Sequence, residues 1–298
     1  MMKTARSPIH RSARRYLPRA RVRAWRGIGV AAACATLLLG TQSALATENG
    51  PAPTLQSTRA DGPFAYQKIT FSTSDTPSSF GGATIWYPTS TAQTYGGIAI
   101  VPGYIENRSV LDWYGARLAS HGFVVISADP NSNYDSPQTR GNVLLAALDW
   151  LVNTSSVKAR VDRTRLAVLG HSMGGGGVLE AVTARSSLKA GYALQPYDTT
   201  KSFPTSVPVA MVGGQSDTVA PPAQHAKRFY PTLAGEKAYL ELSNYGHTIP
   251  KDDKPAAATY VLSWIKRWVD GDTRYTQFLC PGPTGDSSVS TYTTTCPF

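Results

Sequence analysis

Apolar residues recur along the chain in two patterns, one typical of buried strands and one typical of helices. Short runs rich in β-branched and aromatic residues predict strands at 66–71, 84–87, 97–101, 123–128, 166–169, 190–194, 209–212 and 238–242. Apolar positions at helical spacing predict helices at 110–121, 139–151, 178–182, 223–233 and 256–269. The first two strands predict a hairpin or meander. The later strands alternate with helices, which indicates an α/β fold with a mostly parallel sheet and helices on both faces.

The first 46 residues have the three parts of a secretory signal. Residues 1–26 contain many Lys and Arg residues and no acid, and 27–39 are an apolar run shorter than the about 20 residues of a membrane span. Ala44-Leu45-Ala46 then matches an A-x-A cleavage site. Arg14-Arg15-Tyr16-Leu17 is compatible with twin-arginine export, and an ordinary arginine-rich head is the alternative. Both routes predict a secreted, extracellular protein.

Most of the net charge of +10 belongs to this signal. The whole chain has 29 basic and 19 acidic residues, and the signal contains nine of the basic residues and none of the acidic ones. The mature chain is therefore nearly neutral, which argues against a nucleic-acid partner. We expect no membrane attachment after signal removal, and a monomer.

The rest of the chain is expected to form one domain. Residues 47–62 are rich in Pro, Thr, Ser and Gly without periodicity, which predicts a flexible N-terminal arm before a domain at 63–298. After signal removal, Cys280 and Cys296 remain, an even count that predicts a disulfide in an exported protein. The bond would hold the Pro- and Thr-rich tail, 281–298, against the body. No histidine lies near either cysteine in sequence, so we expect no metal and no cofactor.

Ser172 is the candidate nucleophile. It is the centre of Gly170-His171-Ser172-Met173-Gly174, which matches G-x-S-x-G between a predicted strand and a predicted helix. Glycine costs about 1 kcal/mol relative to alanine inside a helix, so the four glycines at 174–177 indicate close packing against the sheet. A flexible glycine-rich loop with a surface serine is the alternative, and the strand–turn–helix context disfavours it.

His247 is the candidate general base. A serine hydroxyl needs an imidazole to remove its proton, and in this topology the order along the chain is Ser, acid, His. His247 lies in the loop after the strand at 238–242. The other histidines lie in the signal, at a helix end, beside Ser172 and within a predicted helix: His10, His121, His171 and His225.

Asp217 is the candidate acid because it follows the strand at 209–212 through a short turn. Asp129, Asp198 and Asp252 are the alternatives. The first two are more simply explained as turn residues, and Asp252 follows the histidine in a charged run.

Two backbone N–H groups should hold the oxyanion. Met173 directly follows the nucleophile and supplies one. The other is expected from the loop after the strand at 97–101. Pro102 has no N–H, which leaves Gly103 or Tyr104, and we assign Tyr104.

At these residues the chain resembles the secreted actinobacterial cutinases and their polyester (PET) hydrolases. The similar stretches are 100–104, 119–126, 170–177, 216–221, 272–283 and 296–298, and they span nearly the whole mature chain. The resemblance implies a lidless α/β-hydrolase fold with Ser172, Asp217 and His247 as the triad. It also implies Tyr104 and Met173 as oxyanion donors, and a shallow groove lined by Tyr104, Met173, Tyr197 and Val219.

The chain departs from this family at the edge of the groove. Gln195-Pro196-Tyr197-Asp198 stands where the family usually has a tryptophan followed by a histidine, and Thr248 stands where it usually has an aromatic residue. The connection between the strands at 190–194 and 209–212 is too short for a helical lid, so an open groove is expected.

These residues predict a secreted serine esterase that hydrolyses polyester bonds, in cutin-like polymers and in PET, through an acyl-enzyme intermediate. The alternative is a short-chain carboxylesterase or lipase that acts on soluble or emulsified esters. A surface-binding protein without catalysis is a further alternative, and the intact Ser, Asp and His in the right order argue against it.

Overall fold

The computed structural model describes residues 47–251, 253–283 and 285–298. The signal predicted at 1–46 and the alternative acid Asp252 lie outside these ranges. The strands are β1 (Tyr66–Phe71), β2 (Ala83–Pro88), β3 (Tyr95–Val101), β4 (Phe123–Ala128), β5 (Val161–His171), β6 (Ala190–Leu194), β7 (Val209–Gly214), β8 (Lys237–Leu242) and β9 (Val289–Thr294).

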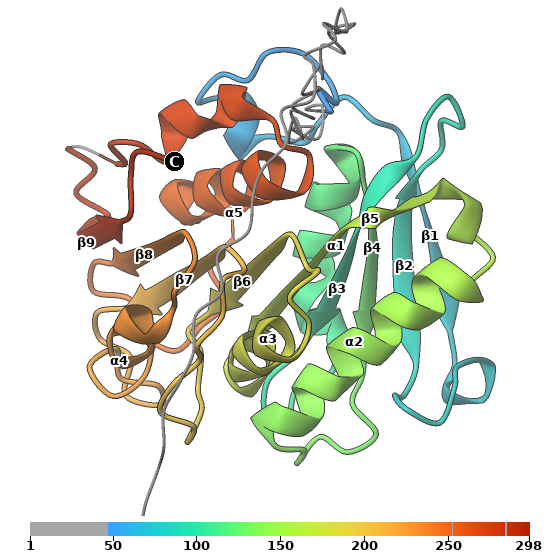
Figure 1. The fold of residues 1–298 in the computed structure, drawn as a ribbon, viewed down its shortest axis with the longest axis horizontal. Helices are drawn as coiled ribbons and strands as arrows, with labels where there is room; N and C mark the ends of the chain where they lie inside the picture. Colours follow the sequence, from blue (N-terminus) through green and yellow to red (C-terminus); the bar gives the residue numbers. More distant parts are fainter. Residues whose placement is uncertain (1–46, 252, 284) are drawn as a thin grey trace, which may run out of the picture. The chain divides into compact units, whose positions relative to one another are not determined.

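In the described part of the chain these strands form one sheet in the order β1-β2-β4-β3-β5-β6-β7-β8-β9 (Figure 1). Neighbouring strands from β4 to β8 in this order are parallel. The pairs β1–β2, β2–β4 and β8–β9 are antiparallel. The predicted mostly parallel sheet is therefore confirmed, and its β1–β2 start is the expected antiparallel pair.

Helices cover both faces of the sheet (Figure 1). The α-helices are α1 (Asp112–Ser120), α2 (Pro137–Asn153), α3 (Met173–Ala184), α4 (Ala226–Phe229) and α5 (Pro255–Val269). The 3₁₀ helices are η1 (Ser57–Arg59), η2 (Thr73–Asp75), η3 (Arg108–Leu111), η4 (Lys158–Arg160), η5 (Tyr230–Thr232) and η6 (Thr273–Phe278). Apolar residues of α2 and α3 pack in one core cluster, and those of α1 and α5 pack in another. No helix of the described ranges is long and apolar enough to cross a membrane.

One predicted helix differs from the structure, and one strand of the structure was not predicted. The helix predicted at 223–233 is α-helical only at Ala226–Phe229 and continues as the 3₁₀ turn η5. Pro231 accounts for the end of this helix, because it lacks the N–H that would donate to the carbonyl of Lys227 in a continued α-helix. The strand β9 was not predicted from its sequence, Val-Ser-Thr-Tyr-Thr-Thr, because an edge strand with half-exposed residues lacks a clear apolar alternation.

The N-terminal segment packs against the body, which differs from the flexible arm that its composition predicts. Asn49 and Thr58 are buried. Thr47 N–H donates to the Asp270 carbonyl at 2.7 Å, and the Asn49 amide donates to the Asp270 carboxylate at 3.2 Å. The amide of Gln93 donates to Asn49 Oδ1 at 2.8 Å. These partners are far away in sequence, so the composition of 47–62 could not predict the contacts.

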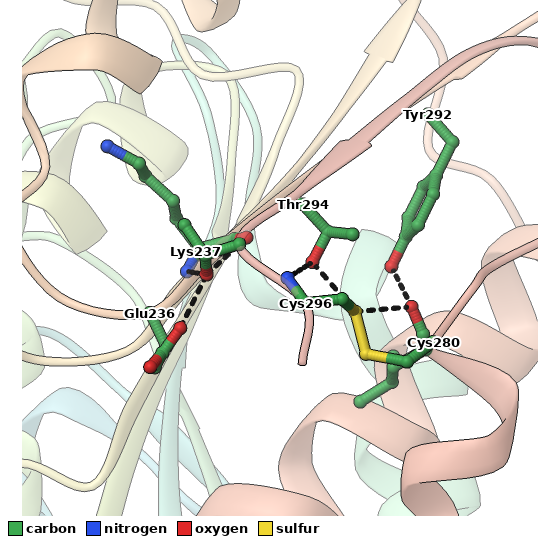
Figure 2. Close-up of a disulfide and its surroundings, with 8 residues drawn as sticks. Glu236, Lys237, Cys280, Tyr292, Thr294 and Cys296 are labelled. Carbon is green, nitrogen blue, oxygen red and sulfur yellow. Dashed lines mark hydrogen bonds between the residues drawn. A yellow bond between two sulfur atoms is a disulfide. The ribbon is translucent and has the colours of Figure 1, made fainter. Parts of the chain in front are cut away.

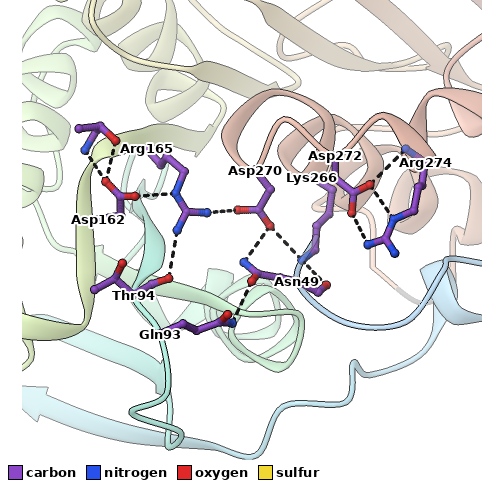
Figure 3. A network of polar contacts seen from close by, with 10 residues as sticks. Asn49, Gln93, Thr94, Asp162, Arg165, Lys266, Asp270, Asp272 and Arg274 are labelled. Carbon is purple, nitrogen blue, oxygen red and sulfur yellow. Dashed lines mark hydrogen bonds and ion pairs between the residues drawn. The ribbon is translucent and has the colours of Figure 1, made fainter. Parts of the chain in front are cut away.

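Asp270, at the end of α5, is the centre of this polar network (Figure 3). Its carboxylate also accepts from Arg165 at 2.7 Å and from the buried ammonium of Lys266 at 3.0 Å. Burial raises the pKa of the Asp270 carboxyl, and the two cations act against that shift. The network thus joins the N-terminal segment, β5 and α5 through one buried carboxylate, whose removal would leave Lys266 as an unpaired buried charge.

The predicted disulfide joins Cys280 and Cys296, whose Cα atoms are 5.8 Å apart (Figure 2). It links the segment after η6 to the end of β9, which pairs with β8 at the edge of the sheet. The Tyr292 hydroxyl donates to the Leu279 carbonyl at 2.7 Å next to the bond. The tail is thus held by a covalent bond as well as by a strand ladder.

Replacing both Cys280 and Cys296 with serine is expected to lower the free energy of unfolding by about 3 kcal/mol, because a cross-link across about 15 residues restricts the unfolded chain. Urea unfolding of wild type and variant measures the difference. A reducing agent is the control, since it should destabilise the wild type and leave the double variant unchanged. Equal stability of the two proteins would contradict the prediction.

Candidate active site

Ser172 lies in a sharp turn between β5, which ends at His171, and α3, which begins at Met173. Its backbone has φ 55° and ψ −120°, a conformation that is costly for a residue with a side chain. Such strain persists only where the surrounding structure enforces it. The local geometry is that of the nucleophile turn expected from G-x-S-x-G.

The glycines on either side of Ser172 are required by close backbone contacts. A Cβ atom on Gly170 would lie 2.3 Å from the Gly174 carbonyl oxygen. A Cβ atom on Gly174 would lie 2.4 Å from the Val101 carbonyl oxygen. Both contacts exclude any side chain. The first brings α3 against β5, and the second brings it against the end of β3. The close packing inferred from the glycine run at 174–177 is therefore present at Gly174.

The structure brings Ser172, His247 and Asp217 together. Ser172 Oγ lies 2.9 Å from His247 Nε2, and His247 Nδ1 lies 2.7 Å from Asp217 Oδ2. Asp217 follows β7 and His247 follows β8, so the parallel sheet places their loops beside the turn that carries Ser172. Both contacts have the length of hydrogen bonds in a nucleophile–base–acid chain.

Asp217 is buried and has two further donors. Val219 N–H and Ala220 N–H donate to Asp217 Oδ1 at 2.9 and 2.8 Å. Burial by itself would raise the pKa of the Asp217 carboxyl, but the hydrogen bonds from His247 and from these N–H groups lower it below its ordinary value. The carboxylate therefore stays ionised and accepts the Nδ1 proton of His247. This leaves Nε2 free to accept the proton of Ser172.

The alternative acids and bases that the structure describes have other partners. Asp129 forms an ion pair with Arg108. Asp198 Oδ1 accepts from Thr200 N–H at 2.8 Å. The His121 ring is hydrogen-bonded to the Ala60 carbonyl at 3.0 Å. The His225 ring packs against the Tyr197 ring, with 4.7 Å between the ring centroids.

The loop after β3 lies directly against the turn of Ser172. A Cβ atom on Gly103 would lie 2.8 Å from Ser172 Cβ. The Gly103 N–H already donates to Glu106 Oε2 at 2.6 Å, so it is not available to an oxyanion. Of the two alternatives for the second oxyanion donor, this leaves Tyr104. Met173 is the first residue of α3, and its N–H has no acceptor within the helix.

The residues expected to line the groove differ in exposure. Val219 and Tyr104 are 55% and 45% exposed, and Met173 and Tyr197 are half-buried. Tyr197 N–H donates to the Ser172 carbonyl at 2.9 Å, which places this residue beside the candidate nucleophile. The surface around Ser172 thus includes exposed aromatic and aliphatic side chains.

Sequence analysis missed a side chain that holds the loop of His247. Gln195 is buried, and its Nε2 donates to the carbonyl oxygens of Gly246 and Thr248, each at 2.7 Å. One amide group therefore fixes the residues on both sides of the candidate base. The only sequence signal was the departure from the family at 195–198, which does not reveal these contacts.

Arg140 was also missed, although it supports the loop of Tyr104. Its buried guanidinium donates to the Pro102 carbonyl at 2.9 Å and to the Asn133 carbonyl at 2.8 Å. Asn133 also accepts from Ile105 N–H at 2.9 Å. The loop after β3 is therefore tied to the loop that precedes α2.

Metal-ligating side chains do not cluster among the residues that the structure describes. These residues contain no group of three or more His, Cys, Asp or Glu side chains that could hold a metal ion. A cavity of about 490 Å³ lies between the N-terminal segment, α5 and the tail, and none of the candidate site residues lines it.

Comparison with known proteins agrees with the fold. A family model described as "PET hydrolase-like" matches residues 41–297. The chain is 47% identical over 279 residues to a bis(hydroxyethyl) terephthalate hydrolase of Streptomyces coelicolor, with 90% of each chain covered. It is 46% identical over 265 residues to Cutinase est1 of Thermobifida alba, with 86% of this chain and 89% of the relative covered.

A cutinase of Thermobifida fusca is 43% identical over 288 residues, with 92% of this chain and 95% of the relative covered. The family model and these relatives cover nearly all of the described residues. The chain therefore belongs to the PET hydrolase-like family of carboxylic ester hydrolases, which have the α/β-hydrolase fold.

Proposed function

We propose that this protein is a secreted serine esterase that cleaves polyesters through an acyl-enzyme, with Ser172 as nucleophile, His247 as general base and Asp217 as the acid that orients it. The observation that carries the proposal is the unbroken chain of hydrogen bonds from Asp217 through His247 to Ser172 Oγ. The extracellular location rests on the signal predicted at 1–46.

In the proposed reaction, Ser172 Oγ attacks the ester carbonyl carbon while His247 Nε2 takes its proton. The N–H groups of Met173 and Tyr104 hold the negative oxygen that forms. His247 then gives the proton to the leaving alcohol, and the acyl group stays on Ser172. A water molecule, deprotonated by His247, attacks this acyl-enzyme. The bond between Ser172 Oγ and the acyl carbon then breaks, His247 returns the proton to Ser172 Oγ, and the carboxylic acid is released.

An open, apolar surface supports a polymer as the substrate. Six large apolar side chains are exposed among the described residues, and four of them belong to the loops of the candidate site: Tyr104, Ile105, Tyr134 and Val219. The rings of Tyr104 and Tyr134 meet edge to face at 5.5 Å. Residues 195–208, between β6 and β7, are all described and form no helix. An open site of this kind suits a chain segment at the surface of a solid.

The relatives point to the same substrate class. One is named for the hydrolysis of a terephthalate ester and others are named cutinases. We therefore propose both cutin-like aliphatic polyesters and aromatic polyesters as substrates, while a preference for soluble or emulsified esters remains the alternative.

Residues 47–298 are expected to release soluble acids from an amorphous PET film and from an aliphatic polyester film, and to hydrolyse p-nitrophenyl butyrate. Chromatography of the supernatant measures film hydrolysis, and absorbance measures the soluble ester. Film with the Ser172→Ala variant is the control for non-enzymatic release. Turnover of the soluble ester without release from either film would contradict the polyester proposal and favour the short-chain esterase.

A further inference from the structure

A second carboxylate, Glu106, lies beside the triad, and the reaction proposed above does not use it. Its Oε2 accepts from Gly103 N–H at 2.6 Å and from His171 Nδ1 at 3.0 Å. Gly103 belongs to the loop after β3, and His171 is the last residue of β5. One oxygen atom therefore connects the loop of the candidate oxyanion donor to the strand that carries the nucleophile.

The histidine in this connection is packed against the candidate base. His171 is 2% exposed, and its ring centroid is 5.0 Å from that of His247, with the planes 38° apart. The side chain of Glu106 is 26% exposed, so it reaches inward from the edge of the site. Glu106 thus has one partner in the oxyanion loop and one that contacts the imidazole of the triad.

The side chain of Glu106 is ionised, and in this form it can accept the hydrogen bonds from both Gly103 and His171. Burial by itself would raise the pKa of the Glu106 carboxyl, but the hydrogen bond and charge of His171 and the N–H of Gly103 lower it below its ordinary value. Glu106 is then ionised at neutral pH. An ionised carboxylate is an acceptor only, so both neighbours must donate to it.

The same carboxylate closes a tight turn. Glu106 N–H donates to the Gly103 carbonyl at 3.3 Å, which adds a main-chain bond across the residues that the side chain also spans. Inside the turn, Ile105 has φ 53°, a costly conformation for a β-branched residue. Tyr104 lies between Gly103 and Ile105, so the orientation of its N–H depends on how firmly this turn is held.

We propose that Glu106 is a positioning residue for the oxyanion hole, and that its carboxylate holds the Gly103–Glu106 turn against the nucleophile strand so that Tyr104 N–H faces the oxyanion as it forms. The inference rests on the proposed esterase function. It concerns the transition state, because the oxyanion exists only there and in the tetrahedral intermediate. Loss of the contact should therefore lower kcat more than it changes KM.

Three variants of Glu106 separate hydrogen bonding from charge and from folding. Glu106→Ala removes the acceptor and is expected to lower kcat for p-nitrophenyl butyrate about 10- to 100-fold, with KM changed less than about threefold. Glu106→Gln keeps an oxygen that can accept from both neighbours, so its kcat should stay within about threefold of wild type. Glu106→Asp keeps the charge but is one methylene shorter, and it should lose kcat as the alanine variant does.

Glu180→Ala is the matched control. Glu180 is also half-buried and accepts from the Thr200 hydroxyl at 2.9 Å, but it lies on α3 and has no bond to the oxyanion loop. Its kcat should equal that of wild type. Thermal midpoints of all variants check that the proteins are folded at the assay temperature, and Glu106→Asp and Glu106→Gln keep the test valid if Glu106→Ala does not fold.

The outcomes distinguish this inference from the proposed function. A wild type without ester turnover would contradict the proposed function itself. With an active wild type, unchanged kcat in both Glu106→Ala and Glu106→Asp would overturn the role of Glu106. Equal losses in Glu106→Gln and Glu106→Ala would also overturn it, because the charge and not the acceptor would then matter. A rise in KM alone, or the same loss in Glu180→Ala, would do so as well.

Discussion

Replacing Ser172 with alanine is expected to lower the turnover of a soluble ester by a factor of about 10⁶. The variant lacks the oxygen that His247 Nε2 meets at 2.9 Å, so no acyl-enzyme can form. Initial rates with p-nitrophenyl butyrate measure the loss. A fluorophosphonate probe, which reacts with activated serines, should label the wild type at Ser172 and leave the variant unlabelled.

Ser263→Ala is a suitable control for this experiment, because Ser263 is also a buried serine and lies in α5. It should keep both the turnover and the labelling. Turnover by Ser172→Ala within about tenfold of wild type would exclude the covalent mechanism, since a factor of 10⁶ is what loss of the nucleophile costs a serine hydrolase. Labelling at a different serine would identify another nucleophile.

Replacing Asp217 with asparagine is expected to lower turnover by about 10⁴ while the protein stays folded. The asparagine oxygen can still accept from Val219 N–H and Ala220 N–H, so the turn is kept. Its NH₂ group, however, donates to His247 Nδ1 instead of accepting from it. The imidazole then carries its proton on Nε2, facing Ser172, and cannot take the proton of the nucleophile.

Steady-state kinetics together with a circular dichroism spectrum test this prediction. Asp198→Asn is the matched control, because Asp198 is a buried carboxylate that the sequence left as an alternative acid and that bonds to Thr200 instead of His247. A large loss in Asp198→Asn with nearly normal turnover in Asp217→Asn would reverse the assignment of the acid.

The site was predictable where the residues of one short segment by themselves fix its backbone conformation. The strand, turn and helix around Ser172 follow from the glycines on either side, because the backbone contacts at Gly170 and Gly174 exclude any side chain. Asp217 and His247 could be assigned because each of them, like Ser172, follows a predicted strand of the parallel sheet, and the three occur in the order Ser, acid, His. The structure adds the distances, 2.7 Å from Asp217 to His247 and 2.9 Å from His247 to Ser172.

Residues whose partners are distant in sequence were not predictable. Gln195 holds Gly246 and Thr248, about fifty positions further along, and Glu106 bonds to His171, 65 positions away. No motif marks either residue, because an amide or a carboxylate in a loop is usually solvated. The docking of Asn49 on Asp270, 221 positions apart, was missed for the same reason.

The sequence by itself determined the alternation of strands and helices, the nucleophile turn and the identity of the candidate triad, because these depend on apolar periodicity, glycine and chain order. Only the tertiary structure decided which groups hold that triad and its oxyanion loop in place, and that Gly103 N–H is already bonded to Glu106. The physical reason is that a hydrogen bond depends on the distance between two atoms in space, and local sequence patterns do not report distances between loops that follow different strands.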